Sequence, residues 1–329
     1  MKLSKDQAIR LAKLVYGQES KRVKEIEQAY KQLQTDTIDT INSYVNDDKS
    51  WNAKAPLDDI KQLLEDVKNL YDDLNDDEQN LVRMAFSDNK LKSNGDMLLA
   101  KVTGLIIGVA IYQRRQLIGG TADISKAYEV KSYQSAKKII KKTPKLSGKT
   151  QGRRFSSNVD VIMQKMARNA VLDRHIDTDI ISSINKQTLQ TIRKVRDIAE
   201  RAAKSNKDSL NWQNEVANVL TGGNRLTNGQ MGRAAGMIRT ATAQSINRTT
   251  LEGLKKRKVK RYKFVSLEAP TTCADCHNLD GKIFNVADAE EGVNYPLIHI
   301  NCQCIVTEVN EDDDWDTSTH DITEDFKKL

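Results

Sequence analysis

The sequence predicts a mainly α protein, with a long helical N-terminal region followed by a small α+β C-terminal domain that carries a zinc-type Cys/His knuckle. Three observations favour this fold class. Apolar residues recur at steps of three and four along most of the chain up to Lys258. From Arg261 the pattern changes to the alternation of polar and apolar residues that is typical of strands. All four cysteines lie between Cys273 and Cys304.

Length and composition limit the class of protein. With 329 residues the chain is long enough for two or three domains. A hydrophobic content of 38% and a charged content of 29% fit a soluble, helix-rich protein better than a disordered or fibrous one. The first residues, Met1 to Gly17, lack an apolar signal core, so we expect synthesis in the cytoplasm, where structural disulfides are disfavoured. The apolar stretch Met97 to Tyr112 contains Lys101 and is shorter than the roughly twenty residues that span a bilayer, so we expect a buried helix and no membrane partner.

Two helices are predicted near the N-terminus. Between Ser4 and Tyr44 one apolar face is formed by Val23, Ile26, Tyr30 and Leu33. Pro56 begins the second helix, because the first turn of a helix tolerates proline. The apolar positions that follow it are Leu57, Ile60, Leu64, Val67 and Tyr71. We expect the two helices to pair as a hairpin.

Further helices are predicted along the rest of the first three quarters. A polar break at residues 87–95 precedes an apolar helix around Leu98 to Tyr112, and Gly119-Gly120 stands before another helical segment, Thr121 to Ile140. A long helix is indicated by the spacing of Ile181, Ile184, Ile192, Val195, Ile198 and Ala202. A short helix is expected at Trp212 to Leu220 and a long one at Asn228 to Lys258.

The domain organisation follows from these patterns. We expect a helical N-terminal region at 1–142, a flexible basic linker or loop at 143–156 and a helical middle region at 157–227. A C-terminal α+β domain at 228–309 contains the strand-like runs RYKFVSL, GKIFNV and CIVTEV. An acidic tail at 310–329 completes the chain.

Charge is unevenly distributed around a net value of +7. Lys131 to Arg154 holds nine basic residues and no acid, a second basic block runs from Lys255 to Lys263, and Glu311 to Asp316 places five acids in six residues. Basic blocks suit phosphate backbones or acidic protein surfaces, although a solvated face explains each block equally well. The candidate nucleic-acid or partner-binding residues are Lys137, Lys138, Lys141, Lys142, Lys145, Lys149, Arg153, Arg154, Lys255, Lys256, Arg257 and Lys258.

The cysteines are the most informative feature. A CADC pair and a HINCQC cluster read as a tetrahedral zinc site in a cytosolic chain, because thiolate and imidazole ligands at short spacing can surround one ion. Cys273 and Cys276 have knuckle spacing. Cys302 and Cys304 are too far apart along a strand to share an ion unless the chain turns, so His299 competes for a place. We expect Cys273 and Cys276 with two of the other three donors.

Other readings of the cysteines and of the chemistry stay open. Residues 273–277 match the CxxCH pattern of haem attachment, and the four cysteines could form two disulfides or a buried thiol cluster. A site with four protein ligands has no open position and stabilises a fold rather than performing chemistry. The chain lacks a Gly-Lys-Ser/Thr phosphate loop, GxSxG and HExxH, so we expect no enzyme. His277 and His299 give only a weak indication of a nuclease.

A longer run resembles a known family. The sequence from Arg239 to Cys304 combines a helix with Arg239 and Asn247, a strand, CxxC followed by LDGKIF, a proline near a histidine, and a closing HxxCxC. This combination resembles the C-terminal domain of phage Mu protein F-like minor head proteins, and the likeness extends over Arg239 to Val309. Pro296 and Gln303 depart from the family's usual pattern without touching the candidate ligands.

The resemblance implies a minor head protein of a tailed phage, made in the host cytoplasm and located inside the virion head. Its implied partners are the portal protein, the major capsid or scaffold protein and, through the basic blocks, phage DNA. Its implied action is in head assembly, by binding the portal, the inner capsid or both. The cofactor expected from the cysteines is a structural zinc ion. The alternatives are a zinc-knuckle DNA-binding protein and a metal-dependent nuclease.

Overall fold

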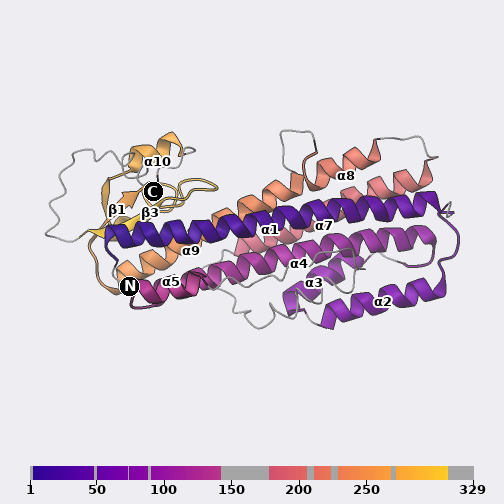
Figure 1. Ribbon diagram of the computed structural model, residues 1–329, viewed down its shortest axis with the longest axis horizontal. Coiled ribbons are helices and arrows are strands. Elements are labelled where there is room, and N and C mark those ends of the chain that lie inside the picture. Colours follow the sequence, from indigo (N-terminus) through magenta and orange to yellow (C-terminus); the bar gives the residue numbers. More distant parts are fainter. Residues whose placement is uncertain are drawn as a thin grey trace.

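The computed structural model is an elongated helical bundle with a small sheet at one end (Figure 1). It describes residues 3–47, 50–72, 74–87, 90–141, 178–205, 211–223, 229–267 and 272–309. The predicted linker 143–156, the first part of the predicted middle region and the acidic tail 310–329 lie outside the described residues. The mainly α fold with an α+β C-terminal part is confirmed.

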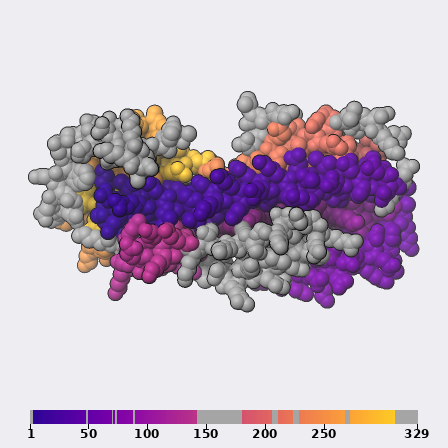
Figure 2. Space-filling view, in the orientation of Figure 1, coloured from indigo at the N-terminus to yellow at the C-terminus, as the bar shows by residue number. Residues whose placement is uncertain are grey.

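Helix α1 (Lys5–Asn46) runs along most of the length of the molecule and crosses the middle of the face shown in Figure 2. Ser4 and Gln7 form a capping box that starts it. The predicted face is buried, since Val23, Ile26 and Tyr30 are at most 3% exposed. At about 1.5 Å per residue, 42 residues separate the two ends of α1 by about 60 Å.

Helix α4 (Asn94–Glu129) runs through the centre of the bundle, packed on α1, α7 and α9. It is long and apolar enough to cross a membrane, but 72% of its most apolar window is buried inside the protein, as expected for a core helix. It continues through Gly119-Gly120, where a break between two helical segments was expected. Gly120 is needed for packing, because a Cβ there would overlap the guanidinium of Arg22 from α1.

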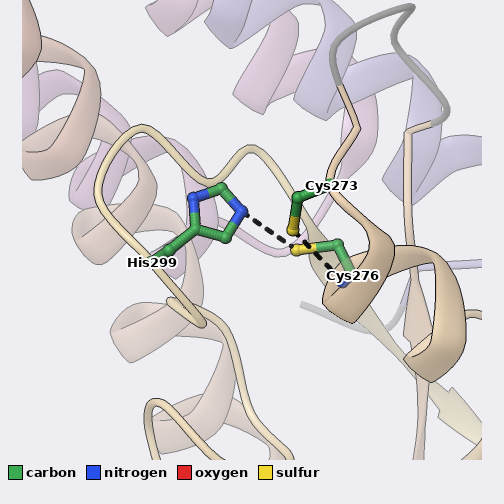
Figure 3. A group of neighbouring side chains, drawn as sticks. All are labelled: Cys273, Cys276 and His299. Atoms are coloured by element: carbon green, nitrogen blue, oxygen red, sulfur yellow. Dashed lines mark hydrogen bonds between the residues drawn. The ribbon is translucent and has the colours of Figure 1, made fainter.

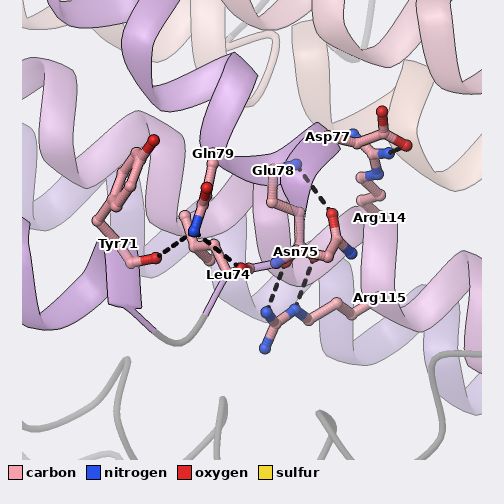
Figure 4. A network of polar contacts seen from close by, with 8 residues as sticks. All are labelled: Tyr71, Leu74, Asn75, Asp77, Glu78, Gln79, Arg114 and Arg115. Atoms are coloured by element: carbon pink, nitrogen blue, oxygen red, sulfur yellow. Dashed lines mark hydrogen bonds and ion pairs between the residues drawn. The ribbon is translucent and has the colours of Figure 1, made fainter.

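Helices α2 (Leu57–Asp72) and α3 (Asp76–Phe86) form a hairpin on one side of α4. Helix α3, which the sequence pattern did not reveal, starts with a capping box between Asn75 and Glu78. Two ion pairs attach it to α4 (Figure 4). Arg115 holds the buried Glu78 through two hydrogen bonds of 2.8 and 2.6 Å, and Arg114 contacts Asp77 at 2.9 Å.

The expected pairing of α1 with α2 is wrong. Helix α1 packs on α4, α5, α7, α8 and α9, whereas α2 packs on α4. Within α2 it is Leu63 that is buried, at 6% exposed, while Leu57 and Leu64 are 64% and 52% exposed. The physical reason is that α4 offers α1 a longer apolar partner than the 16-residue α2 can provide.

The later helices match the expected positions, but the expected segment Thr121 to Ile140 is divided between the end of α4 and a separate short helix. Helix α5 (Tyr133–Lys141) packs on the N-terminal part of α1, and α7 (Thr178–Lys204) lies along α4. Helix α8 (Trp212–Leu220) has the predicted bounds and is followed by Gly222 and Gly223, both with positive φ. Helix α9 (Gly229–Lys256) packs on both α1 and α4 and leads into the sheet.

The sheet has the order β2-β1-β3, and all its strands are antiparallel. Strand β1 (Arg261–Val265) is central and pairs with β2 (Ile283–Asn285) and β3 (Ile305–Val309). Short helix α10 (Ala274–Leu279) lies between β1 and β2, and a single 3-10 turn, η2 (Val286–Asp288), follows β2. The three predicted strand runs are thus confirmed, and they surround the cysteines.

Candidate metal centre

The first half of the cysteine cluster is the start of α10. Cys273 is the N-cap residue of this helix, and its sulfur accepts a hydrogen bond from the backbone N–H of Cys276 at 3.4 Å. That bond lowers the pKa of the Cys273 thiol. The CxxC spacing therefore places one sulfur at the helix start and the second, on Cys276, one turn further in the buried interior.

The second half is a turn that precedes β3. The backbone N–H of Cys302 bonds to the carbonyl oxygen of His299, and Asn301 adopts a left-handed conformation with φ of 65°. Asparagine is among the few residues that accept this conformation readily. Cys302 and Cys304 lie before the strand rather than in it, so the chain makes the turn that lets both sulfurs approach one point.

All five predicted donors come together around Cys276. The donor atoms of Cys273, Cys276 and His299 lie within 4.8 Å of one another, and so do those of Cys276, Cys302 and Cys304. The Cys276 sulfur is 3.2 Å from Nε2 of His299 (Figure 3) and 3.8 Å from the sulfur of Cys302. Tetrahedral zinc with bonds of about 2.3 Å to sulfur separates its sulfur ligands by about 3.8 Å. The donor chemistry and these spacings fit such an ion.

His299 is oriented for this role by its own backbone neighbour. Its Nδ1 lies 2.8 Å from the carbonyl oxygen of Ile300, which can only accept, so Nδ1 carries the proton. Nε2 is then left facing Cys276. A backbone carbonyl that holds the distal N–H of a histidine is a common second partner of metal-binding histidines.

Burial and mutual hydrogen bonds perturb the thiols strongly. All four cysteines are free, and three of them are at most 4% exposed. Burial raises the pKa of Cys276 to about 12. A hydrogen bond from Cys304 lowers the pKa of Cys302 to about 5 and correspondingly raises that of Cys304. Cys276 and Cys304 therefore hold their protons at neutral pH, and a cation bound by either would have to displace them.

Residues of the LDGKIF run hold the cluster in place. Asp280 accepts a 2.6 Å hydrogen bond from the backbone of Ser266, and Gly281, at φ of 75°, makes the turn into β2. Leu279 and Phe284 pack with Phe264 against the cysteine side chains. The run therefore forms the apolar wall and the turn of the knuckle.

Helix α9 supplies the other support. Asn247 is fully buried, and its amide donates to the carbonyl oxygen of Cys304 at 3.0 Å. The hydroxyl of Tyr295 donates to the carbonyl oxygen of Asn247 at 2.6 Å. The hydroxyl of Thr240 accepts from the backbone of Asn301 at 3.3 Å. These bonds attach both ends of the second cysteine cluster to one helix.

One acidic residue of α1 reaches the same region and was missed in the sequence. Glu19 is 1% exposed, lies 3.8 Å from Arg239 of α9 and hydrogen-bonds the side chain of Gln303. Burial raises its pKa from 4.5 to about 7, against the opposite effects of Arg239 and Gln303. The available signal was a glutamate on the apolar face of α1, four residues from both Val15 and Val23.

The structure places the described part of the basic blocks at one end of the molecule. Lys138 and Lys141 are exposed and Lys137 is half-buried on α5, while Lys255, Lys256, Arg257 and Lys258 are exposed where α9 ends. Among these, Arg257 forms an ion pair with Glu308 at 2.9 Å. Five predicted residues lie outside the described part of the chain: Lys142, Lys145, Lys149, Arg153 and Arg154.

Together, these elements define a helical bundle whose C-terminal sheet encloses a thiol and imidazole cluster that could hold a metal ion. Residues 180–307 match the model of the family described as Phage Mu protein F like protein. The match begins in α7 and ends in β3, which extends the resemblance beyond Arg239 toward the N-terminus. Neither the curated proteins nor the solved structures compared with the chain gave a match. The match associates this part of the chain with phage head morphogenesis.

Proposed function

We propose that this chain is a minor head protein of a tailed phage that acts in head assembly by binding the portal protein, the inner capsid or both. The observation that carries the proposal is the family match over 180–307, because it includes α9 and the complete Cys/His cluster. Its location would then be the interior of the phage head. The major capsid or scaffold protein is the second partner that this role requires.

The proposed cofactor is one structural zinc ion. Cys273 and Cys276 would hold it with two of His299, Cys302 and Cys304. This ion would join α10 to the turn before β3, and hence the two halves of the C-terminal part of the chain. A closed set of four protein ligands leaves no position for substrate, which supports a structural role.

Contact with packaged DNA is a further part of the proposal. The exposed lysines of α5 and of the end of α9 form a sequence-independent phosphate-binding surface in this account. Tyr133 and Tyr262 are the aromatic residues of the two basic blocks, and Tyr262 is fully buried, so base stacking is not part of the proposal. Affinity for a DNA duplex should fall steeply with salt and change little with sequence.

The direct test is binding to the portal protein of the same phage. Tagged portal protein, co-expressed with the full chain, should retain it through gel filtration. A Cys276→Ser variant should be retained less, whereas His277→Ala, which changes an exposed neighbour in the same helix, should be retained normally. A chain that binds neither portal nor capsid protein, but cuts plasmid DNA when Mg²⁺ or Mn²⁺ is added, would replace this proposal with the nuclease alternative.

A further inference from the structure

One part of the surface is strongly acidic in a chain that is basic overall. Residues 57–79 carry nine acidic and two basic side chains, while the net charge of the chain is +7. Asp59, Glu65, Asp72 and Asp76 are exposed, and within the described part of the chain none of them forms an ion pair. Helix α2 and the start of α3 therefore present uncompensated negative charge.

Helix α2 also exposes large apolar side chains among the described residues. Leu57 and Leu64 are 64% and 52% exposed. They are seven residues apart, two full turns, so they share one face of α2. This face lies away from the contact that Leu63 makes with Met97 and Ala100 of α4. Burying two leucines on association would add an apolar contribution to any electrostatic attraction.

The complementary charge lies at the opposite end of the same molecule. Residues of α5 and the second half of α9 pack in one cluster with the N-terminal part of α1. Helix α2, by contrast, begins just beyond the C-terminal end of α1 (Figure 1). Five exposed lysines at the basic end form no ion pair with a described residue: Lys138, Lys141, Lys255, Lys256 and Lys258.

The two surfaces are too far apart to neutralise each other within one chain. The start of α3 pairs with Arg114 and Arg115, about fifteen residues or roughly 22 Å along α4 from the end of that helix near α5. Helix α2 contacts α4 farther away still, near its N-terminus, whereas charges are screened over about 8 Å at physiological salt. A second copy has no such restriction, because its basic end can meet the acidic surface of the first directly.

We propose that the acidic, leucine-bearing surface of α2 and the start of α3 binds the basic end, formed by α5 and the C-terminus of α9, of a second copy of this chain. The contact is heterologous, because two different surfaces meet, and so it joins chains head to tail. It leaves the thiol cluster outside the interface and does not depend on the portal-binding role.

Charge reversal provides the test, with the full chain studied by sedimentation velocity. One variant combines Asp59→Lys, Glu65→Lys and Asp72→Lys, and the other combines Lys138→Glu, Lys141→Glu and Lys255→Glu. Each should sediment as a monomer alone, since both of its ends then have the same sign. Their equimolar mixture should associate, because opposite charges are again available. A control with Arg193→Glu and Lys194→Glu, exposed on α7, should associate like the wild type.

Wild-type association should weaken as salt rises from about 0.05 M to about 0.5 M. The proposal is overturned if the wild type is monomeric at low salt, if either reversed variant still associates alone, or if the mixture stays monomeric. A wild type that is monomeric at low salt but binds a DNA duplex through the lysines of its basic end would assign that end to nucleic acid alone. Circular dichroism of each variant establishes that it is folded.

Discussion

The side-chain amide of Asn247 donates a hydrogen bond to the backbone carbonyl oxygen of Cys304 at 3.0 Å, and both groups are buried. This bond joins the middle of α9 to the residue that precedes β3. An asparagine in the sequence run that resembles the family thus positions a candidate metal ligand. It also explains why the long helix and the cysteines occur together in that run.

Replacing Asn247 with leucine should destabilise the C-terminal part of the chain. The carbonyl oxygen of Cys304 would be left buried without its donor, at a cost of about 1–3 kcal/mol. Urea unfolding followed by circular dichroism measures the effect. Asn80→Leu, at an exposed position of α3, is the matched control and should change stability by less than about 0.5 kcal/mol. If both substitutions lower the free energy of unfolding equally, Asn247 does not position Cys304.

Cys276→Ser should abolish metal binding more completely than any other single substitution in the cluster. Its sulfur belongs to both donor groups, whereas Cys273 and His299 belong to one and Cys302 and Cys304 to the other. Elemental analysis of purified protein should give about one zinc per wild-type chain and none for the variant. His277→Ala should retain its zinc. Wild-type protein that folds normally with four thiols and no metal would refute a zinc-stapled domain.

Glu19 should make stability depend on pH. Burial raises its pKa from 4.5 to about 7, so between these values the folded chain holds a proton that the unfolded chain has lost. The free energy of unfolding should therefore fall as pH rises from about 4.5 to about 7 and level off above that range. Glu19→Gln should remove this fall, which amounts to roughly 3 kcal/mol. Urea titrations at several pH values measure it, and Glu65→Gln, at an exposed position, should leave the slope unchanged.

The two adjacent glycines of α4 should respond oppositely to alanine. A Cβ at Gly119 meets no atom within 4 Å, so Gly119→Ala should stabilise the helix by up to about 1 kcal/mol. A Cβ at Gly120 would overlap Arg22, which is 7% exposed and has little room to move. Gly120→Ala should destabilise by about 1–3 kcal/mol. Thermal unfolding of the two variants measures both effects. If both substitutions stabilise the protein, the packing of Arg22 against Gly120 does not require glycine.

Much of the fold could be predicted from local pattern. Helices α1, α7 and α9 each bury one face, so their apolar residues repeat at helical spacing over several turns. The strands could be predicted from the alternation of polar and apolar residues. The CxxC and HxxCxC motifs indicated the cysteine cluster. These features depend only on neighbours in the sequence.

Features that depend on distant partners could not be predicted. The Gly119-Gly120 pair suggested a break because nothing in the sequence reveals Arg22 lying against Gly120. The pairing of α1 with α4 rather than with α2 is a choice between apolar faces that look alike. The turn at Asn301, which brings Cys302 and Cys304 to Cys276, is specified by contacts with Thr240 across the fold.

The assignment to the phage head is tested most directly by quantitative mass spectrometry of purified, DNA-filled heads. The account predicts that this chain is present in every preparation, in few copies relative to the major capsid protein, and that it remains after washing in high salt. Its absence from purified heads, with the protein found only in the soluble fraction of infected cells, would contradict a structural role in the head.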